Sequence, residues 1–404
     1  MLHKAKKDSE KAESDVVSES ASILRKTCRR AIVETLHNCR LLDIARNVAR
    51  RYSISARHGS GFPRFVRHPL PKFGILCYHR VGVEGVPLHS RLEPKRFDAQ
   101  MRHLKKHYRI VPLGQLCHEL REASPVAPTL AITFDDGYRD LYRHAFPVLQ
   151  KYSIPATIYL IGRCMETGEV PWYDRIFLAL QSIGDSCLEL ELDSPRSFAL
   201  ASAQARAAAA WEIICFLRSI PDAQRRTWCT EMQRRYPVDE RKLTDRMLDW
   251  AHVREMRRGG VNFGAHSMTH PAVSRLEAVD FPEELAASKR LLEDGVDGPI
   301  EDFAYPFGKP TDFSRPAQAF LAECGYRSGV TTLHGYNSPG ANPFELRRLQ
   351  VDDNLPFADF CLDICRMFLN GPEESGPANV ALPGRREPLL AVQSNEVAAN
   401  VNHA

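Results

Sequence analysis

From residue 73 onward, short apolar runs alternate with segments of helical periodicity, and this alternation restricts the fold more than any other feature of the sequence. Apolar residues dominate six runs that predict buried strands, at residues 73–78, 130–134, 156–161, 261–265, 302–305 and 328–332. Helical spacing predicts helices between them, at residues 97–107, 139–152, 248–258, 282–292 and 316–324. Strands and helices that alternate in this way form a parallel sheet covered by helices, either open or closed into a barrel.

The first 72 residues differ in charge from the rest of the chain. They hold 16 Lys and Arg against 7 Asp and Glu, a net charge of +9, so residues 73–404 carry −5 of the overall +4. Residues 1–20 are polar and predict a disordered start, whereas residues 23–51 place apolar side chains at helical spacing among arginines. This basic amphipathic helix could pack on the following domain or lie on an anionic membrane surface. Aromatic residues are not interleaved with the basic ones, so we expect no nucleic-acid binding.

Residues 165–247 break the alternation of strands and helices. An alanine-rich tract at residues 201–210 and the apolar residues after it predict a mainly helical insertion within a domain of residues 73–355. The remaining residues, 356–404, predict a short amphipathic helix to about residue 369 and then a loose tail of small and polar residues. We therefore expect three parts: a basic extension, a large α/β domain with an insertion, and a C-terminal helix with a tail.

Composition also indicates the cellular compartment in which we expect the protein. No run of about 18 apolar residues is present to span a membrane, and the N-terminus lacks the apolar core of a signal peptide. The 11 cysteines are scattered and form no Cys-x-x-Cys pair, which is typical of reduced thiols. The sequence therefore predicts a cytoplasmic protein, with peripheral contact to the inner face of an anionic membrane through the basic N-terminal helix as a further expectation.

Carboxylates and imidazoles follow the carboxyl ends of the predicted strands. The residues concerned are Asp135, Asp136, His266, His270 and His79, together with the turn at 306–308. Because the carboxyl ends of parallel strands meet at one edge, where α/β folds place their sites, these side chains could share one site. An Asp-Asp pair alone is also typical of a turn or a helix cap, so the spacing leaves both a metal site and a structural role open.

Three motifs in chain order carry a family resemblance. They are Thr133-Phe-Asp-Asp-Gly-Tyr138, His266-Ser-Met-Thr-His270 and Phe303-Ala-Tyr-Pro-Phe-Gly308, preceded by Ile75-Leu-Cys-Tyr-His-Arg-Val81. Together they resemble the motifs of polysaccharide deacetylases with the NodB homology domain, carbohydrate esterase family 4, over roughly residues 73–355. The resemblance implies a distorted (β/α) barrel of the NodB homology type, a divalent metal, and hydrolytic removal of acetyl groups from amino sugars.

The resemblance also implies roles for individual residues. Asp136, His266 and His270 match the metal ligands, and an Asp/His₂ set is typical of a catalytic zinc site with open positions. Asp135 matches the general base, and Phe307 matches the residue whose backbone N–H helps to hold the oxyanion. Further aromatic residues are candidate walls for stacking a sugar ring, with core packing as the alternative: Tyr305, Tyr138, Trp172 and Tyr173.

Two departures from the family pattern concern the base and the acid. Where many members carry an arginine beside the base, this chain has Ala304, and Arg347 or Arg348 after the last predicted strand could substitute. The late Leu-His motif that supplies a general acid has no clear counterpart. His79 is the preferred acid because the buried run before it can fix its orientation, whereas His334 reads as part of a loop.

The function that these features predict is metal-dependent deacetylation of N-acetylated amino sugars in a polysaccharide, oligosaccharide or lipid-linked glycan. Such an enzyme is a hydrolase of non-peptide carbon–nitrogen bonds, of the polysaccharide or chitooligosaccharide deacetylase type, and would serve the synthesis of an exopolysaccharide or glycolipid. Two alternatives stay open: a noncatalytic carbohydrate-binding or scaffold barrel, and a hydrolase of another acyl or C–N bond at the same metal.

Overall fold

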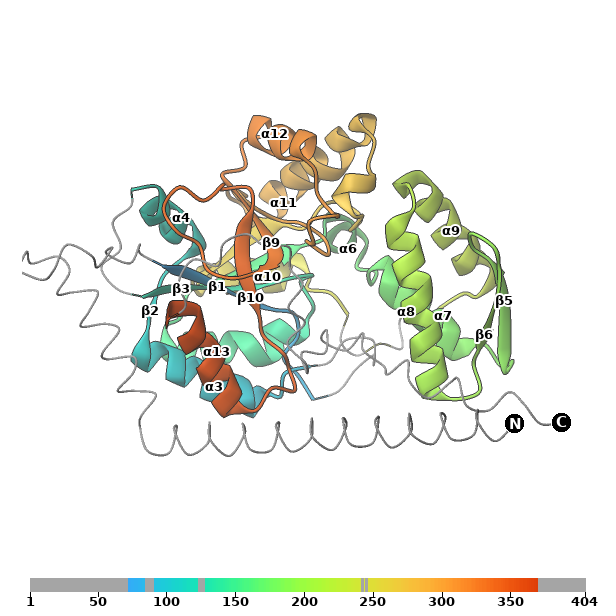
Figure 1. Ribbon diagram of the computed structural model, residues 1–404, viewed down its shortest axis with the longest axis horizontal. Coiled ribbons are helices and arrows are strands. Elements are labelled where there is room, and N and C mark those ends of the chain that lie inside the picture. Colours follow the sequence, from blue (N-terminus) through green and yellow to red (C-terminus); the bar gives the residue numbers. More distant parts are fainter. Residues whose placement is uncertain (1–71, 84–90, 123–127, 241–242, 244–245, 370–404) are drawn as a thin grey trace, which may run out of the picture. The chain divides into compact units, whose positions relative to one another are not determined.

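The computed structural model describes residues 72–83, 91–122, 128–240, 243 and 246–369 (Figure 1). The predicted N-terminal amphipathic helix and the C-terminal tail lie outside these residues. The chain divides into two compact units. Residues 70–354 belong to one unit, and helix α13 (Phe357–Leu369) belongs to the other. Among the described helices, none combines the length and the apolar character that crossing a bilayer requires.

Seven parallel strands close into a barrel. Around the ring, each strand pairs with the next, and the last pairs with the first: β1 (Phe73–Tyr78), β10 (Leu346–Gln350), β9 (Ser328–His334), β8 (Asp302–Ala304), β7 (Val261–Ala265), β4 (Ala156–Leu160) and β3 (Thr129–Phe134). A short eighth strand, β2 (Arg109–Ile110), pairs with the start of β3. The chain is thus an α/β protein with the predicted (β/α) barrel, and its sheet is closed rather than open.

Helices follow the strands around the barrel (Figure 1). Their bounds are α3 (Pro94–His107), α4 (Leu113–Arg121), α5 (Phe146–Tyr152), α6 (Gly162–Thr167), α10 (Trp250–Arg258), α11 (Ser288–Val296) and α12 (Arg315–Glu323). Strands β1 and β3 are buried along their whole length, which is why they read as continuous apolar runs. The six predicted strands and five predicted helices are confirmed to within a few residues. One-turn π segments precede α5 and α11, at Leu141–Ala145 and Pro282–Ala287.

The barrel needs glycine at one close approach beside the site. A Cβ on Gly264 of β7 would lie 2.5 Å from the Tyr159 ring and 2.8 Å from the Asp302 carbonyl oxygen. Real side chains do not tolerate such contacts, so glycine lets β7 sit tightly between β4 and β8. This packing fixes the strand that leads directly into His266.

The insertion contains more than the helices that the sequence predicts. Helices α7 (Trp172–Ser182), α8 (Ala203–Ser219) and α9 (Asp222–Arg235) share a hydrophobic cluster with an antiparallel hairpin, β5 (Cys187–Glu191) and β6 (Pro195–Ala199). The expectation of a mainly helical insertion missed this hairpin. Its strands are short and charged, and only alternate residues such as Leu188 and Leu190 are buried.

Two further expectations about the end of the barrel are wrong. The last strand is β10 rather than β9, so Arg347 and Arg348 lie within a strand and not after one. His334 is the last residue of β9 and does not belong to a loop. The sequence Leu-Arg-Arg-Leu-Gln of β10 contains no apolar run and therefore does not predict a buried strand. One of its arginines, Arg348, is nevertheless fully buried.

Candidate metal centre

Loops after β3 and β7 bring one carboxylate and two imidazoles together. The ligand atoms of Asp136, His266 and His270 all lie within 4.8 Å of one another, and all three residues are buried. Asp136 Oδ1 is 3.5 Å from Nε2 of each histidine. Two ligands of one tetrahedral zinc ion, each about 2.1 Å from it, lie about 3.4 Å apart. The spacing and the chemistry of this donor set therefore fit a single divalent cation.

Unusual backbone conformations aim these side chains. Asp136 and His270 both have positive φ angles, 72° and 60°, which non-glycine residues adopt rarely. The hydroxyl of Ser267 accepts a hydrogen bond from the His270 backbone N–H at 3.0 Å and so closes the loop. His266 Nδ1 pairs with the Ala304 carbonyl oxygen at 2.7 Å, which leaves Nε2 to face Asp136.

Burial keeps the three ligands uncharged when no cation balances them. Burial, with the charge of the neighbouring Asp135, raises the pKa of Asp136 to about 8. Burial lowers the pKa of His266 to about 4 and that of His270 well below its usual value. At neutral pH the metal-free site thus holds one protonated carboxyl and two neutral imidazoles. A bound cation would favour loss of this proton, so that Asp136 would act as an anionic ligand.

The adjacent carboxylate has the opposite electrostatics. Burial opposes ionisation of Asp135, but the Arg348 guanidinium outweighs it and holds the pKa of Asp135 well below its usual value. The pair is bidentate, with Nη1 to Oδ1 and Nη2 to Oδ2 both 2.7 Å, and Arg348 is fully buried. Asp135 is therefore ionised and held in one orientation, whereas the pKa of the neighbouring Asp136 carboxyl is raised.

Of the two arginines that the sequence offers as candidates, Arg348 is the one that contacts Asp135. Its Nε donates to the Thr331 carbonyl oxygen at 2.7 Å, which fixes the guanidinium across the barrel interior. Arg347 is exposed and donates instead to the His334 carbonyl oxygen at 3.1 Å. Since side chains alternate along a strand, only one of two neighbouring arginines can face inward, and it is Arg348.

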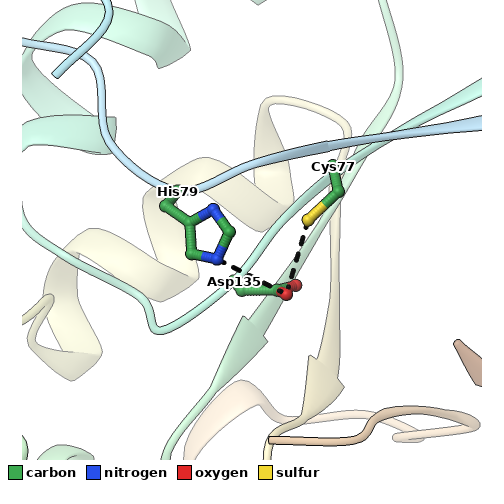
Figure 2. Close-up of side chains that lie close together, drawn as sticks. All are labelled: Cys77, His79 and Asp135. Atoms are coloured by element: carbon green, nitrogen blue, oxygen red, sulfur yellow. Dashed lines mark hydrogen bonds and ion pairs between the residues drawn. The ribbon is translucent and has the colours of Figure 1, made fainter. Parts of the chain in front are cut away.

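Two more side chains meet Asp135 from the end of β1. Figure 2 shows that Cys77 and His79 both point toward this carboxylate, with Cys77 Sγ 3.5 Å and His79 Nε2 4.0 Å from Oδ2. These three residues also have ligand atoms within 4.8 Å of one another. Arg348 already takes both oxygens of Asp135, and its charge repels a second cation there. We therefore assign the group to the surroundings of Asp135 and not to a metal.

The remaining predicted residues divide into two groups. Phe307 lies at the site, because its ring centroid is 4.9 Å from that of His270. Tyr138 and Tyr305 are fully buried. The Tyr138 hydroxyl donates to Asp174 at 2.7 Å, and the Tyr305 ring stacks in the core, so neither ring offers a face to a sugar. For these two residues, core packing replaces the predicted stacking role.

The insertion supplies contacts that the sequence did not reveal as part of the site. Trp172 and Tyr173 of α7 are buried, and the Tyr173 ring centroid is 4.9 Å from that of His270. The Trp172 indole N–H donates to the His270 carbonyl oxygen at 3.0 Å. The sequence offers both as candidate walls for a sugar, and the structure shows both in contact with His270. The only signal for this role is the aromatic pair at the start of a predicted insertion.

Comparisons with known proteins identify the family of the chain and a similar fold. The family model described as polysaccharide deacetylase matches residues 123–329, just over half of the chain. The Bacillus subtilis (strain 168) protein "Putative polysaccharide deacetylase YxkH" is 23% identical over 291 residues, which cover 72% of this chain and 75% of that protein. The structure of Streptococcus pyogenes deacetylase PplD in complex with acetate is similar with a TM-score of 0.50 and 20% identity, and the match covers 73% of this chain and 99% of that one.

Proposed function

The chain belongs to the polysaccharide deacetylase family, and from this membership we propose that it hydrolyses N-acetyl groups of amino sugars in a polysaccharide, oligosaccharide or lipid-linked glycan. The observation that supports the proposal is the pair of adjacent carboxylates with opposite surroundings. Asp136 faces two neutral imidazoles, and Asp135 faces a buried guanidinium. Hydrolysis of an amide needs both a cation site and a separate base, and this pair provides for both.

Asp136, His266 and His270 would hold the divalent cation, and the nitrogen and oxygen ligands favour zinc. When bound, the cation supplies Lewis acidity for the acetyl carbonyl and for water. The protein contributes the fixed orientation of the ligands, since His266 is held by the Ala304 carbonyl and the His270 loop by Ser267. This arrangement keeps the two imidazoles in place before the cation arrives.

Asp135 would accept the proton of the attacking water. Arg348 keeps the carboxylate ionised and fixes the direction of its oxygens, at the cost of some basicity. Phe307 would offer its backbone N–H to the developing oxyanion from the turn beside His270. His79 would return a proton to the leaving amine, since it lies 4.0 Å from Asp135 and keeps a third of its side chain exposed.

The proposal is tested by acetate release. Protein reconstituted with Zn²⁺ or Co²⁺ is incubated with N-acetylglucosamine oligomers, and acetate and free amine are measured together. Equal amounts of both products support the proposal, and chelated protein serves as the control. Binding of the oligomers without acetate would favour a noncatalytic barrel, and release of acetate only from O-acetylated sugars would favour an esterase.

Cation affinity should depend on pH through Asp136. Below about pH 8 the metal-free carboxyl is protonated, so binding must displace one proton, and affinity should fall about tenfold per pH unit down to about pH 5. Above about pH 8 this dependence should disappear. Competition titration with a chelator measures the slope, and calorimetry in buffers of different ionisation enthalpy counts the released proton. A pH-independent affinity between about pH 5 and about pH 8 would contradict the assignment.

Replacing His79 with alanine should lower the deacetylation rate about 10²-fold while the protein retains its cation. Burial lowers the pKa of His79 below its usual value of 6.5. The protonated imidazole, which is the acid, is therefore lost as the pH rises through this lowered pKa. The wild-type rate should therefore fall on the basic side, and the variant should lack this limb. His334→Ala is the matched control, because His334 is exposed at the end of β9. Equal rates for wild type and His79→Ala would exclude the role.

A further inference from the structure

Each helix of the insertion makes a polar contact with a loop of the metal centre. Trp172 of α7 donates to the His270 carbonyl oxygen, and Arg225 of α9 donates to the Thr269 hydroxyl at 3.0 Å. From α8, Arg218 reaches Asp312, in the segment that follows the Phe307 turn. The insertion thus contacts both the loop that carries a histidine ligand and the turn that carries the proposed oxyanion donor.

The contact made by Arg218 is the most directional of the three. Its Nε lies 3.0 Å from Asp312 Oδ1 and its Nη2 lies 2.6 Å from Oδ2, which forms a bidentate pair. The Arg218 side chain is 17% exposed and that of Asp312 is 4% exposed, so water screens the pair little. The guanidinium also lies over the Phe307 ring, 4.8 Å from its centroid. One side chain therefore holds the turn at two points.

The turn between these points has a demanding backbone. Phe307 has a φ angle of 61° and Gly308 one of 66°, so two consecutive residues are left-handed. A non-glycine residue keeps such a conformation only when its surroundings hold it there. On the barrel side, the Thr332 hydroxyl donates to the Phe307 carbonyl oxygen at 2.7 Å. On the insertion side, Asp312 accepts the Lys309 backbone N–H at 2.8 Å and is itself held by Arg218.

We propose that Arg218 is a positioning residue of the active site, through which the insertion fixes the Phe307 turn for transition-state stabilisation. The inference rests on the proposed function, since it concerns the N–H of Phe307 as an oxyanion donor. Arg218 acts through Asp312 and the Phe307 ring and touches neither the cation ligands nor Asp135. An oxyanion donor works only at a defined distance, so a small relaxation of the turn reduces the rate more than it reduces substrate binding.

The test compares Arg218→Met with Arg196→Met. Arg196 of β6 pairs with Asp193 and Glu212 at the surface of the same insertion, so its variant loses an ion pair of the insertion without touching the turn. In Arg218→Met we expect kcat to fall about 10- to 100-fold, with KM and cation affinity within about twofold of wild type. Arg218→Lys should recover part of the rate, because it retains the charge and one hydrogen bond to Asp312.

A second measurement does not depend on catalysis. Hydrogen exchange of the peptide spanning residues 305–312 should become at least about tenfold faster in Arg218→Met and should stay unchanged in Arg196→Met. If exchange is faster in Arg218→Met but the wild-type protein releases no acetate, the role of Arg218 in holding the turn is upheld and the proposed function is overturned. Unchanged exchange, or an active Arg218→Met enzyme with wild-type kcat, would overturn the inference. Should Arg218→Met fail to fold, Arg218→Lys is judged by the same two measurements.

Discussion

His266→Ala is expected to lose its divalent cation and, with it, at least about 10³-fold of the deacetylation rate. The substitution removes one of three ligands and leaves the Asp136 carboxyl facing a single imidazole, so that the cation affinity should drop by more than about 100-fold. Removing the cation withdraws several kcal/mol of transition-state stabilisation, which corresponds to the expected loss in rate. Metal content after dialysis and acetate release are measured on the same sample.

The control for this variant is His252→Ala. His252 lies on α10, where it pairs with Asp249 near the surface, and makes no contact with the metal centre in the described part of the chain. It should bind and react as wild type does. If His266→Ala retains a full equivalent of cation at wild-type affinity, the ligand assignment is wrong, whatever happens to the rate.

Asp135→Asn should separate the base from the ligands. Asp136, His266 and His270 stay intact, so the variant should bind its cation within about tenfold of wild type. An amide cannot accept the proton of the attacking water, and the rate should fall by about 10² to 10⁴-fold. The amide also leaves the buried Arg348 guanidinium without its carboxylate, so the free energy of unfolding should fall by a few kcal/mol.

Three measurements decide the second prediction. Cation content, acetate release and thermal unfolding are compared between wild type and Asp135→Asn, and Asp135→Glu tests whether a displaced carboxylate restores part of the rate. A folded Asp135→Asn protein that holds its cation and hydrolyses substrate at the wild-type rate is the result that would exclude Asp135 as the base.

The sequence predicts the barrel strands well, because most of them are buried on both faces and read as apolar runs. It also points to Asp135, Asp136, His266 and His270, since strand ends and motif order both indicate them. Strand β10 escapes prediction because Arg348 is buried in it, and a charged residue in a strand looks like the surface. Its burial depends on a partner more than 200 residues away, and no local pattern contains that information.

The roles of aromatic residues are equally hard to read from local sequence. Tyr138 and Tyr305 belong to motifs near the site, but both rings are fully buried, and Tyr138 packs in a small cluster with Ile161, Cys164 and Met247. Trp172 belongs to the insertion, yet its indole N–H supports the loop of a histidine ligand. Which face of a ring is covered depends on packing between distant segments. The hairpin of the insertion escapes prediction for a different reason: its strands are short and charged, and only alternate residues are buried.

Strand β1 lies between β3 and β10, so the Asp135–Arg348 pair spans three neighbouring strands of the ring. In a closed barrel an inward-facing side chain of β10 can reach the carboxylate that follows β3, two strands away around the ring. The guanidinium that contacts Asp135 can therefore come from β10 although residue 304 on β8 is alanine. A motif search that requires an arginine two residues before Pro306 would find Ala304 in this chain, although a guanidinium from β10 contacts Asp135. A search for the partner of this carboxylate in a related chain therefore has to include every strand whose side chains face the barrel interior.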